Sequence, residues 1–366
     1  MLSYFKGAFL FTIVCLGLAV WLGWETTGSV VGTAGLLWIV IVLSILEVSL
    51  SFDNAVVNAS VLKEMSPVWR QRFLTWGIAI AVFGMRIVFP LLIVAIAARL
   101  GPIEALKLAA GNPAEYERII TSAHVGIAGF GGAFLAMVGL KFFFDRDKDI
   151  HWIGLIERRL ASLASVHAIE IGVVLLSLYG VSKLLPSEGE ALTFIVAGIF
   201  GILAHLAVEA VNSLLEPDAH AIAGGAARSG LAGFLYLNLL DSAFSFDGVI
   251  GAFALSNNIF VIALGLGIGA MFVRSMTIML VDKGTLAHYR YLEHGAFWAI
   301  IALAVVMLLS ARFHIPEVIT GVVGAVFIGL SLYGSARYNR RHPSDPVFGT
   351  LDDCSPVRPD GSELKS

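Results

Sequence analysis

Two short segments of the sequence carry acidic residues inside long apolar stretches, and the two segments share one pattern. The first has Glu47 six residues before Asp53, and the second has Asp241 six residues before Asp247. Both segments end in the tripeptide Ser-Phe-Asp. Neither segment contains a cysteine, and carboxylate oxygens are the ligands that Mg²⁺, Ca²⁺ and Mn²⁺ prefer. The pattern therefore indicates chemistry with a hard cation.

An arginine follows each acidic segment at a corresponding place. Gly77 precedes Arg86 by nine residues, and Gly265 precedes Arg274 by nine. A charge at the centre of a bilayer costs about 2.5–3.5 kcal/mol on insertion scales, so these side chains must face one another, a cavity or a bound ion. Four acids and two arginines sum to −2, which one divalent cation or two protons would neutralise. The alternative is that these charged residues have a purely structural role, in which the arginines are only counter-ions that hold the helices together.

Helical spacing places polar side chains on one face of each segment. The first face consists of Glu47, Ser51, Asn54 and Asn58, and the second of Asn238, Asp241, Ser245 and Gly248. Asp53 and Asp247 lie about a third of a turn away from these faces. A helix break at Ser-Phe-Asp would bring both carboxylates inward, as broken helices do in secondary transporters. We therefore expect a break in both segments.

Composition identifies the elements that must position these side chains. Of 366 residues, 58% are hydrophobic and 14% are charged, and the mean hydropathy is +0.86. These values exclude a water-soluble enzyme and a disordered chain. The net charge of −3 provides no basic face for nucleic acid. A bilayer span needs about 20 mostly apolar residues, and ten stretches qualify: 5–23, 34–56, 73–98, 123–143, 163–184, 191–214, 229–254, 258–281, 294–311 and 316–335.

The fold class that we expect is an all-α, polytopic transmembrane bundle of about ten helices. The acidic segments lie in the second and seventh stretches, an odd number apart, so they cross the bilayer in opposite directions. This arrangement is an inverted repeat. Within a transmembrane bundle over residues 1–335, we place repeat one at about 34–143, repeat two at about 229–335 and inserted helices at about 163–214. The polar, proline-containing composition of residues 336–366 predicts a disordered cytoplasmic tail.

The distribution of lysine and arginine predicts the orientation. Seventeen of the 24 basic residues lie at the N-terminus, in the even-numbered loops or in the tail, five lie in the other loops, and Arg86 and Arg274 lie inside spans. Both termini are therefore expected in the cytoplasm, with the chain in a bacterial inner (plasma) membrane. The first stretch ends in Trp21 and Trp24 rather than in a cleavage site, so we expect it to be retained.

The inserted stretches carry a second set of polar residues. His167 with Glu170 and His205 with Glu209 each share a helix face. These pairs are either metal or proton-relay groups, or helix–helix hydrogen-bonding groups near the interface. Gly265 and Gly269 predict close helix packing.

At these residues the chain resembles the TerC family of integral membrane proteins. The resemblance rests on Glu47-x5-Asp53-Asn54 with Met85-Arg86 downstream, on Asp241 to Asp247 with Arg274 downstream, and on the stretch from Gly129 to Lys141. It covers about half of the chain and implies that Glu47, Asp53, Asn54, Asp241 and Asp247 line an ion site. TerC proteins are linked to tellurium resistance and to export of manganese or related divalent ions. Gly248 departs from the family pattern, which has serine there, and the inserted helices depart from its core.

The sequence thus predicts a transporter that exports a divalent cation, Mn²⁺ before Ca²⁺ or Mg²⁺, with no tightly bound cofactor. Ser51, Ser245, Arg86 and Arg274 are expected to support the metal ligands. The partners are the lipid bilayer and the metal ion, with a homo-oligomer left open. The alternatives are a membrane scaffold or accessory protein in metal or tellurium stress, and an intramembrane metal-dependent hydrolase. The chain has no known nucleophile or zinc-protease motif, so an enzyme is not expected.

Overall fold

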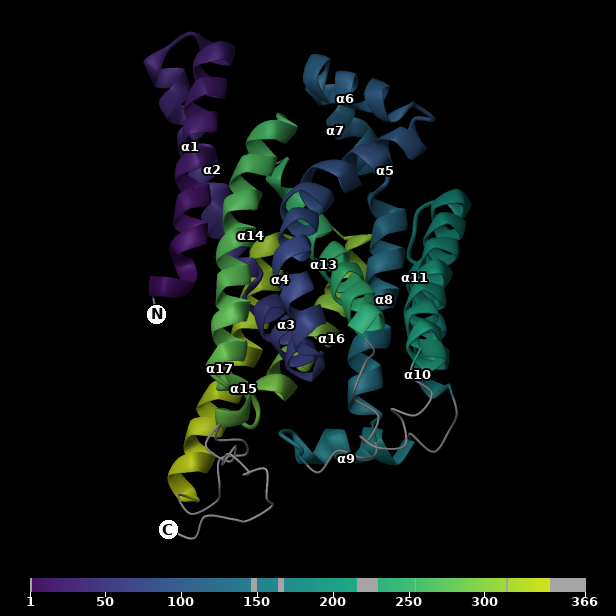
Figure 1. Ribbon diagram of the computed structural model, residues 1–366. Helices are drawn as coiled ribbons and strands as arrows, with labels where there is room; N and C mark the ends of the chain where they lie inside the picture. Colours follow the sequence, from purple (N-terminus) through teal and green to yellow (C-terminus); the bar gives the residue numbers. More distant parts are fainter. Residues whose placement is uncertain are drawn as a thin grey trace.

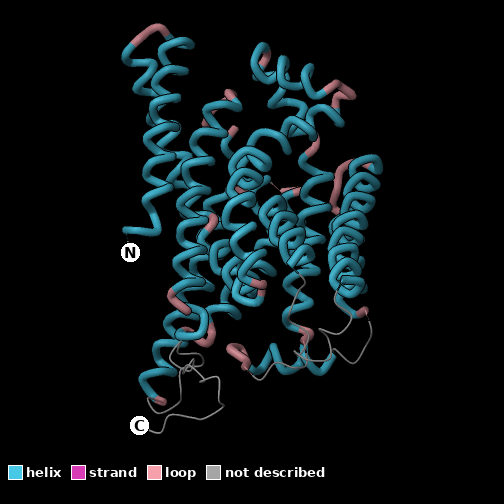
Figure 2. The backbone as a smooth tube through the Cα atoms, in the orientation of Figure 1, coloured by secondary structure: helices cyan, strands magenta, loops and turns pink. Residues whose placement is uncertain are grey.

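The computed structural model describes residues 2–145, 150–163, 168–215, 230–253, 255–313 and 315–342. Within these ranges the chain is helical and has no strand, which confirms the expected all-α bundle (Figures 1 and 2). The long helices run roughly side by side, with α1 and α2 at one edge and α10 and α11 at the other (Figure 1).

The first half of the chain contains a broken series of helices. The elements are η1 (Leu2–Phe5), α1 (Lys6–Thr27), α2 (Val30–Leu50), α3 (Phe52–Glu64), α4 (Pro67–Ala79), the π-helix η2 (Ile80–Val88), α5 (Phe89–Ala97), α6 (Pro102–Gly111), α7 (Pro113–Ser122) and α8 (His124–Phe143).

The second half has longer uninterrupted helices. The elements are α9 (Gly154–Leu163), α10 (Ile169–Ser182), α11 (Glu188–Leu215), α13 (Gly230–Ala252), α14 (Ile259–Asp282), α15 (Thr285–His288), α16 (Leu292–Ser310) and α17 (Glu317–Arg341). Because α17 continues to Arg341, residues 336–341 belong to a helix and not to the expected tail. The tail beyond residue 342 lies outside the described residues.

Six helices of the described part are long and apolar enough to cross a membrane: Ser3–Thr27, Val30–Leu50, His124–Phe143, Glu188–Val211, Ile259–Asp282 and Leu292–Ser310. A seventh span is formed if Val68–Gly77 and Val82–Ala97, bent by 43°, count as one. The expected span 163–184 contains the shorter helix α10, while the spans 229–254 and 316–335 correspond to α13 and α17. Each of the ten expected stretches thus contains a helix where it is described, but six of the described helices, or seven spans with the bent pair, are long and apolar enough to cross a membrane.

The two Ser-Phe-Asp segments fold differently. The first is broken as expected, because α2 ends at Leu50, Ser51 leaves the helical conformation (φ −102°, ψ 18°), and α3 begins at Phe52. The break expected in the second segment is wrong, because α13 continues through Ser245 and Gly248. The tripeptide by itself is compatible with a helix, so the surrounding contacts decide whether it breaks.

Close helix packing positions the centre of the bundle. A Cβ atom added at Gly265 of α14 would lie 2.6 Å from Leu43 Cβ on α2, and one added at Gly269 would collide with Glu47. The Ser44 hydroxyl also donates to the Gly265 carbonyl oxygen (3.0 Å). The close approach predicted from the two glycines is confirmed, and it fixes α2 against α14.

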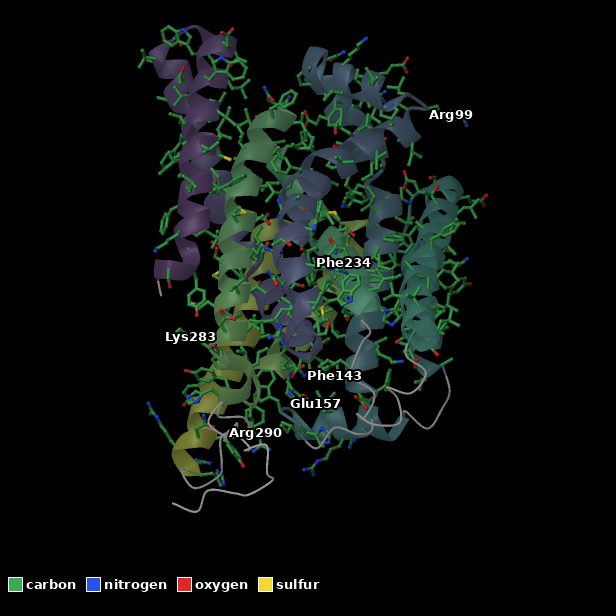
Figure 3. All side chains as sticks on the ribbon, in the orientation of Figure 1. Arg99, Phe143, Glu157, Phe234, Lys283 and Arg290 are labelled. Carbon is green, nitrogen blue, oxygen red and sulfur yellow. The ribbon has the colours of Figure 1, made fainter. Side chains whose placement is uncertain are left out.

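The two ends of the bundle carry different residues. Arg99 lies at one end, whereas Lys283 and Arg290 lie at the other, where α9 crosses below the bundle (Figures 1 and 3). The ten expected spans place Arg99 in an odd-numbered loop and Lys283 and Arg290 in an even-numbered loop, so the sequence also predicts opposite ends for them. Which end faces the cytoplasm stays a prediction.

Candidate functional site

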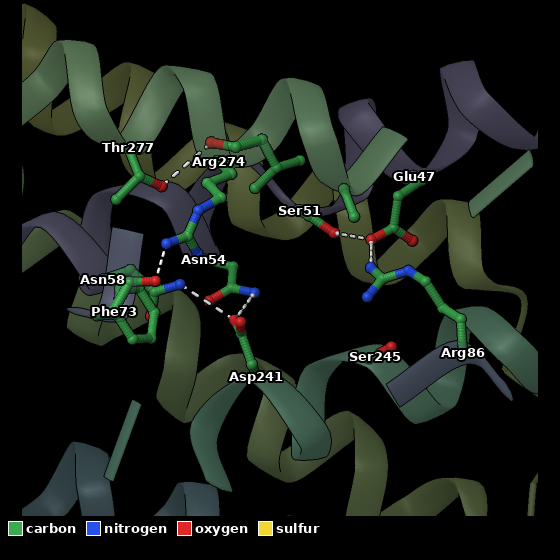
Figure 4. Close-up of a pocket in the computed structure, with 12 residues that line it drawn as sticks. Glu47, Ser51, Asn54, Asn58, Phe73, Arg86, Asp241, Ser245, Arg274 and Thr277 are labelled. Carbon is green, nitrogen blue, oxygen red and sulfur yellow. Dashed lines mark hydrogen bonds and ion pairs between the residues drawn. The ribbon is translucent and has the colours of Figure 1, made fainter. Parts of the chain in front are cut away.

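A small cavity of about 30 Å³ lies at the centre of the bundle. This volume is enough for one or two water-sized occupants. It is lined by side chains from α2, the α2–α3 junction, α3, α4, η2, α13 and α14: Glu47, Ser51, Asn54, Asn58, Phe73, Arg86, Asp241, Ser245, Ala270, Val273, Arg274 and Thr277 (Figure 4). The acid-bearing segments of both halves therefore reach the same cavity.

Glu47 forms the first charged contact of the cavity. Its Oε1 accepts a hydrogen bond from Arg86 Nη2 and another from the Ser51 hydroxyl (3.2 Å). Glu47 and Arg86 are 4% and 5% exposed, so this is a fully buried ion pair. Its partners come from the helix break and from the π-helix η2. A π-helical turn is rare and often occurs at functional sites.

Asp241 is held in a different way, by amides. Its Oδ1 accepts hydrogen bonds from Asn54 Nδ2 (2.9 Å) and Asn58 Nδ2 (3.0 Å), both on α3 (Figure 4). This contact joins the first-half helix α3 to the second-half helix α13. The four-residue spacing of the two asparagines brings both amides to one carboxylate oxygen.

Arg274 is buried beside Asp241 without a direct hydrogen bond to it in the described structure. Its Nη2 donates to the Phe73 carbonyl oxygen, and its guanidinium carbon lies 4.8 Å from the centre of the Phe73 ring. Thr277, three residues further along α14, also lines the cavity and donates to the Val273 carbonyl oxygen (3.1 Å).

The cavity is balanced in formal charge and has uncommitted oxygen atoms. Glu47 and Asp241 are its described acids, and Arg86 and Arg274 are its described bases, so their charges cancel. Three buried oxygens have no hydrogen-bond partner among the described residues: Asn54 Oδ1, Asn58 Oδ1 and Ser245 Oγ. Buried polar atoms are normally paired with protein, water or an ion. These oxygens therefore fit a hard cation or an ordered water.

Asp53 does not join the cavity, in contrast to the expectation from the sequence. Its Oδ1 accepts the Asn54 backbone N–H (2.9 Å), and its Oδ2 lies toward Gly324 on α17. The break at Ser51 starts a new helix, and in that helix the cavity-facing positions are Asn54 and Asn58. The side chain of Asp247 lies outside the described residues. The described residues include no group of three His, Cys, Asp or Glu side chains that could hold a metal ion.

Residues that the sequence did not single out also line the cavity. Phe73 contributes its ring and its carbonyl oxygen, and nothing in the sequence distinguishes it from the other aromatic residues. Thr277 lies three residues after Arg274, so a search for polar residues on the same helix face would have found it.

The polar pairs of the inserted helices lie elsewhere in the bundle. His205 and Glu209 of α11 contact each other (3.5 Å) and are not part of the cavity lining. Glu170 lies in the first turn of α10. His167 lies outside the described residues, so its pairing with Glu170 is not described.

The fold and the cavity define a class: a helical membrane protein with a buried ionic cavity between two acid-bearing segments. Residues 52–342 match the family described as "Protein of unknown function (DUF475)", and the chain belongs to this family. The matched range includes Asn54, Arg86, Asp241 and Arg274, while Glu47 precedes it. The chain matches no curated protein and no solved structure.

Proposed function

We propose that this protein transports a divalent cation across the membrane and that the central cavity is the cation site. The proposed substrate is Mn²⁺, with Ca²⁺ and Mg²⁺ as competitors, and the proposed direction is outward. One observation carries the proposal: Glu47 from the first acidic segment and Asp241 from the second line the same buried cavity. The resemblance of these segments to TerC proteins supports the choice of ion and direction.

The oxygen set around the cavity suits such an ion. Asp241 Oδ1 and the amide oxygens of Asn54 and Asn58 lie on facing helices, and Ser245 adds a hydroxyl. Carboxylate, amide and hydroxyl oxygens are hard ligands of the type that Mn²⁺, Ca²⁺ and Mg²⁺ accept. In this proposal Asp53 is a neighbour of the site and not a ligand in the conformation described.

The arginines determine what must happen when the cation enters. Arg86 donates to Glu47, so a cation that binds Glu47 must displace this guanidinium. A buried acid left without a partner would be strongly destabilising, so Arg86 neutralises Glu47 while the cation is elsewhere. The π-helix around Arg86 and the 43° bend near it provide a segment that can rearrange.

Transport by purified protein tests the proposal. The chain is reconstituted in liposomes, and Mn²⁺ entry is followed with a trapped fluorescent indicator. We expect saturable flux that is lost in Asp241→Asn and in Glu47→Gln. The matched control is Glu115→Gln, which removes an acid paired with Arg118 (2.7 Å) on the outer face of α7, away from the cavity, and should keep full flux.

Three results would contradict the proposal or part of it. Wild-type liposomes without flux would contradict transport and favour a scaffold or accessory role. Full flux in both cavity variants would contradict the assignment of the site. Turnover of a lipid or peptide substrate by the protein, without flux, would favour a hydrolase.

A further inference from the structure

The exposed face of α17 changes from apolar to basic along the helix. Five exposed apolar or aromatic side chains recur at helical spacing on this face: Ile319, Val322, Val326, Leu330 and Tyr333. Three exposed arginines continue the same face to the end of the helix: Arg337, Arg340 and Arg341. The opposite face contains the buried residues Ser331 and Ser335 and packs against α16. The three arginines form the basic end of α17.

This order of side chains matches the depth profile of a bilayer. Tyrosine is enriched at the edge of the hydrocarbon core, and basic residues just beyond a transmembrane helix face the lipid headgroups. The headgroup layer is about 5–8 Å thick on each side. At a rise of about 1.5 Å per residue, Arg337 lies about 6 Å beyond Tyr333 along the axis of α17. The basic end therefore begins in the headgroup layer when Tyr333 lies at the edge of the core.

A fourth arginine, from another part of the chain, lies beside the basic end of α17 (Figure 3). Arg290 belongs to the link between α15 and α16, and its guanidinium carbon is 4.4 Å from the centre of the Tyr338 ring on α17. Its Nε is buried and has no hydrogen-bond partner among the described residues. The Asn339 side-chain amide also donates to the His288 carbonyl oxygen (3.0 Å), which holds this link against α17. Two separate segments thus bring their arginines together.

The four arginines at this place lack acidic partners. Among the described residues, neither Arg290 nor the basic end forms an ion pair with a carboxylate. Three other exposed cations do form one: Lys63 with Glu293 (3.0 Å), Lys141 with Glu209 (3.0 Å) and Arg118 with Glu115 (2.7 Å). Positive charges gathered without acids repel one another, and an anion relieves this repulsion. The surface is therefore suited to an anionic ligand.

A phospholipid fits both parts of this helix face. Its acyl chains would lie along the apolar stripe from Ile319 to Tyr333, and its phosphate would lie at the arginines beyond the stripe. Guanidinium groups bind phosphate oxygens through paired hydrogen bonds. A soluble anion would contact only the arginines and would gain nothing from the stripe. The continuity of the two parts therefore favours a lipid over a soluble anion.

We propose that Arg290 and the basic end of α17 bind the headgroup of an anionic phospholipid in the adjoining leaflet. The lipid phosphate accepts hydrogen bonds from the guanidinium groups, and no covalent bond forms or breaks. This inference goes beyond cation transport and does not rest on it, because the surface would bind lipid whether or not the protein carries a metal. It requires only that α17 lies in a membrane.

Native mass spectrometry of the full chain in detergent tests this inference. Phosphatidylglycerol and phosphatidylcholine with identical acyl chains are added separately, and the bound lipid molecules are counted. We expect the wild type to bind phosphatidylglycerol more tightly than phosphatidylcholine. Arg290→Gln should weaken the binding of phosphatidylglycerol about fivefold, and Arg337→Gln/Arg340→Gln/Arg341→Gln should weaken it about fivefold for each arginine removed. The binding of phosphatidylcholine should change little in either variant.

The matched control is Lys63→Gln/Arg118→Gln/Lys141→Gln, which removes three exposed cations that have acidic partners and should keep the wild-type affinity. Equal affinity of the wild type for both lipids, or an equal loss in this control, would overturn the proposal.

Two other occupants of the surface would also be revealed by this experiment. Residues 343–366 carry five acidic and two basic residues, so they compete with the lipid for the arginines. If Asp352→Asn/Asp353→Asn in the full chain raises the affinity for phosphatidylglycerol, the surface belongs to these residues and the proposal is overturned. If the wild type is a dimer that the triple-arginine variant loses, the surface belongs to a second copy of the chain instead.

Discussion

The two acidic segments share a motif, but they support the cavity by different means. In the first half the helix breaks at Ser51, and Glu47 is held by a direct ion pair with Arg86. In the second half the helix is continuous, and Asp241 is held by the amides of Asn54 and Asn58 while Arg274 binds the Phe73 carbonyl oxygen. A motif repeated in sequence thus yields one tight ionic contact and one looser, amide-supported carboxylate.

This difference suggests different tasks for the two acids. The Glu47–Arg86 pair is closed, so it must open before Glu47 can bind anything else. Asp241 keeps a carboxylate near unpaired amide oxygens, so it is better placed to receive a cation first.

The largest effect is expected from removing the first-half acid. Glu47→Ala should lower the free energy of unfolding by about 3–5 kcal/mol, because it leaves Arg86 buried without its counter-ion. Asp241→Ala should cost only about 1–3 kcal/mol, because it leaves amides rather than a directly paired arginine. Thermal unfolding of both variants in detergent measures the difference. Equal losses would show that the two acids are held equally.

The double variant Glu47→Gln/Arg86→Gln sharpens this test. If the two residues form an isolated pair, the double variant should regain much of the stability that Glu47→Gln loses. A double variant as unstable as the sum of the two single variants would contradict the pairing.

Intermediate effects are expected at the glycines that precede the two arginines. Gly265→Ala should cost about 1–3 kcal/mol or more, because the new Cβ would lie 2.6 Å from Leu43 Cβ on a tightly packed helix. Gly77→Ala should cost less, because its new Cβ would lie 3.2 Å from Arg274 Nη1 and from Phe73 Cδ2, which are both side-chain atoms. The same unfolding assay applies, and a larger loss for Gly77→Ala would reverse the comparison.

The smallest effects are expected at the two serines of the repeated tripeptide. Ser51→Ala should cost about 1 kcal/mol, because the hydroxyl donates to Glu47 Oε1 (3.2 Å). Ser245→Ala should be close to neutral for stability, because its hydroxyl has no hydrogen-bond partner among the described residues. If Ser245 is a cation ligand, its variant should instead weaken Mn²⁺ transport. Unchanged transport in Ser245→Ala would remove it from the ligand set.

Much of the fold follows from the sequence because apolar stretches in a membrane have few alternatives to a helix. The stripe of Glu47, Ser51, Asn54 and Asn58 also correctly places four cavity residues. It does so because the hydrogen bond from Ser51 N–H to the Glu47 carbonyl keeps the turn nearly helical across the break.

The position of Asp53 could not be obtained in this way. Its side chain direction depends on the conformation of Ser51 and on the space beside Gly324, which lies in a distant part of the sequence. The continuity of α13 has the same origin, because identical tripeptides meet different neighbours. Contacts between distant helices, such as Arg274 with Phe73, leave no periodic signal in the sequence.

The most direct measurement is to locate bound manganese. Crystals of the protein grown with Mn²⁺ are measured at a wavelength where manganese scatters anomalously. We expect an anomalous peak in the central cavity, next to Asp241 and the amide oxygens of Asn54 and Asn58, that disappears in Asp241→Asn. If saturating Mn²⁺ gives no peak in the cavity, or a peak only elsewhere in the protein, the cavity is not the cation site.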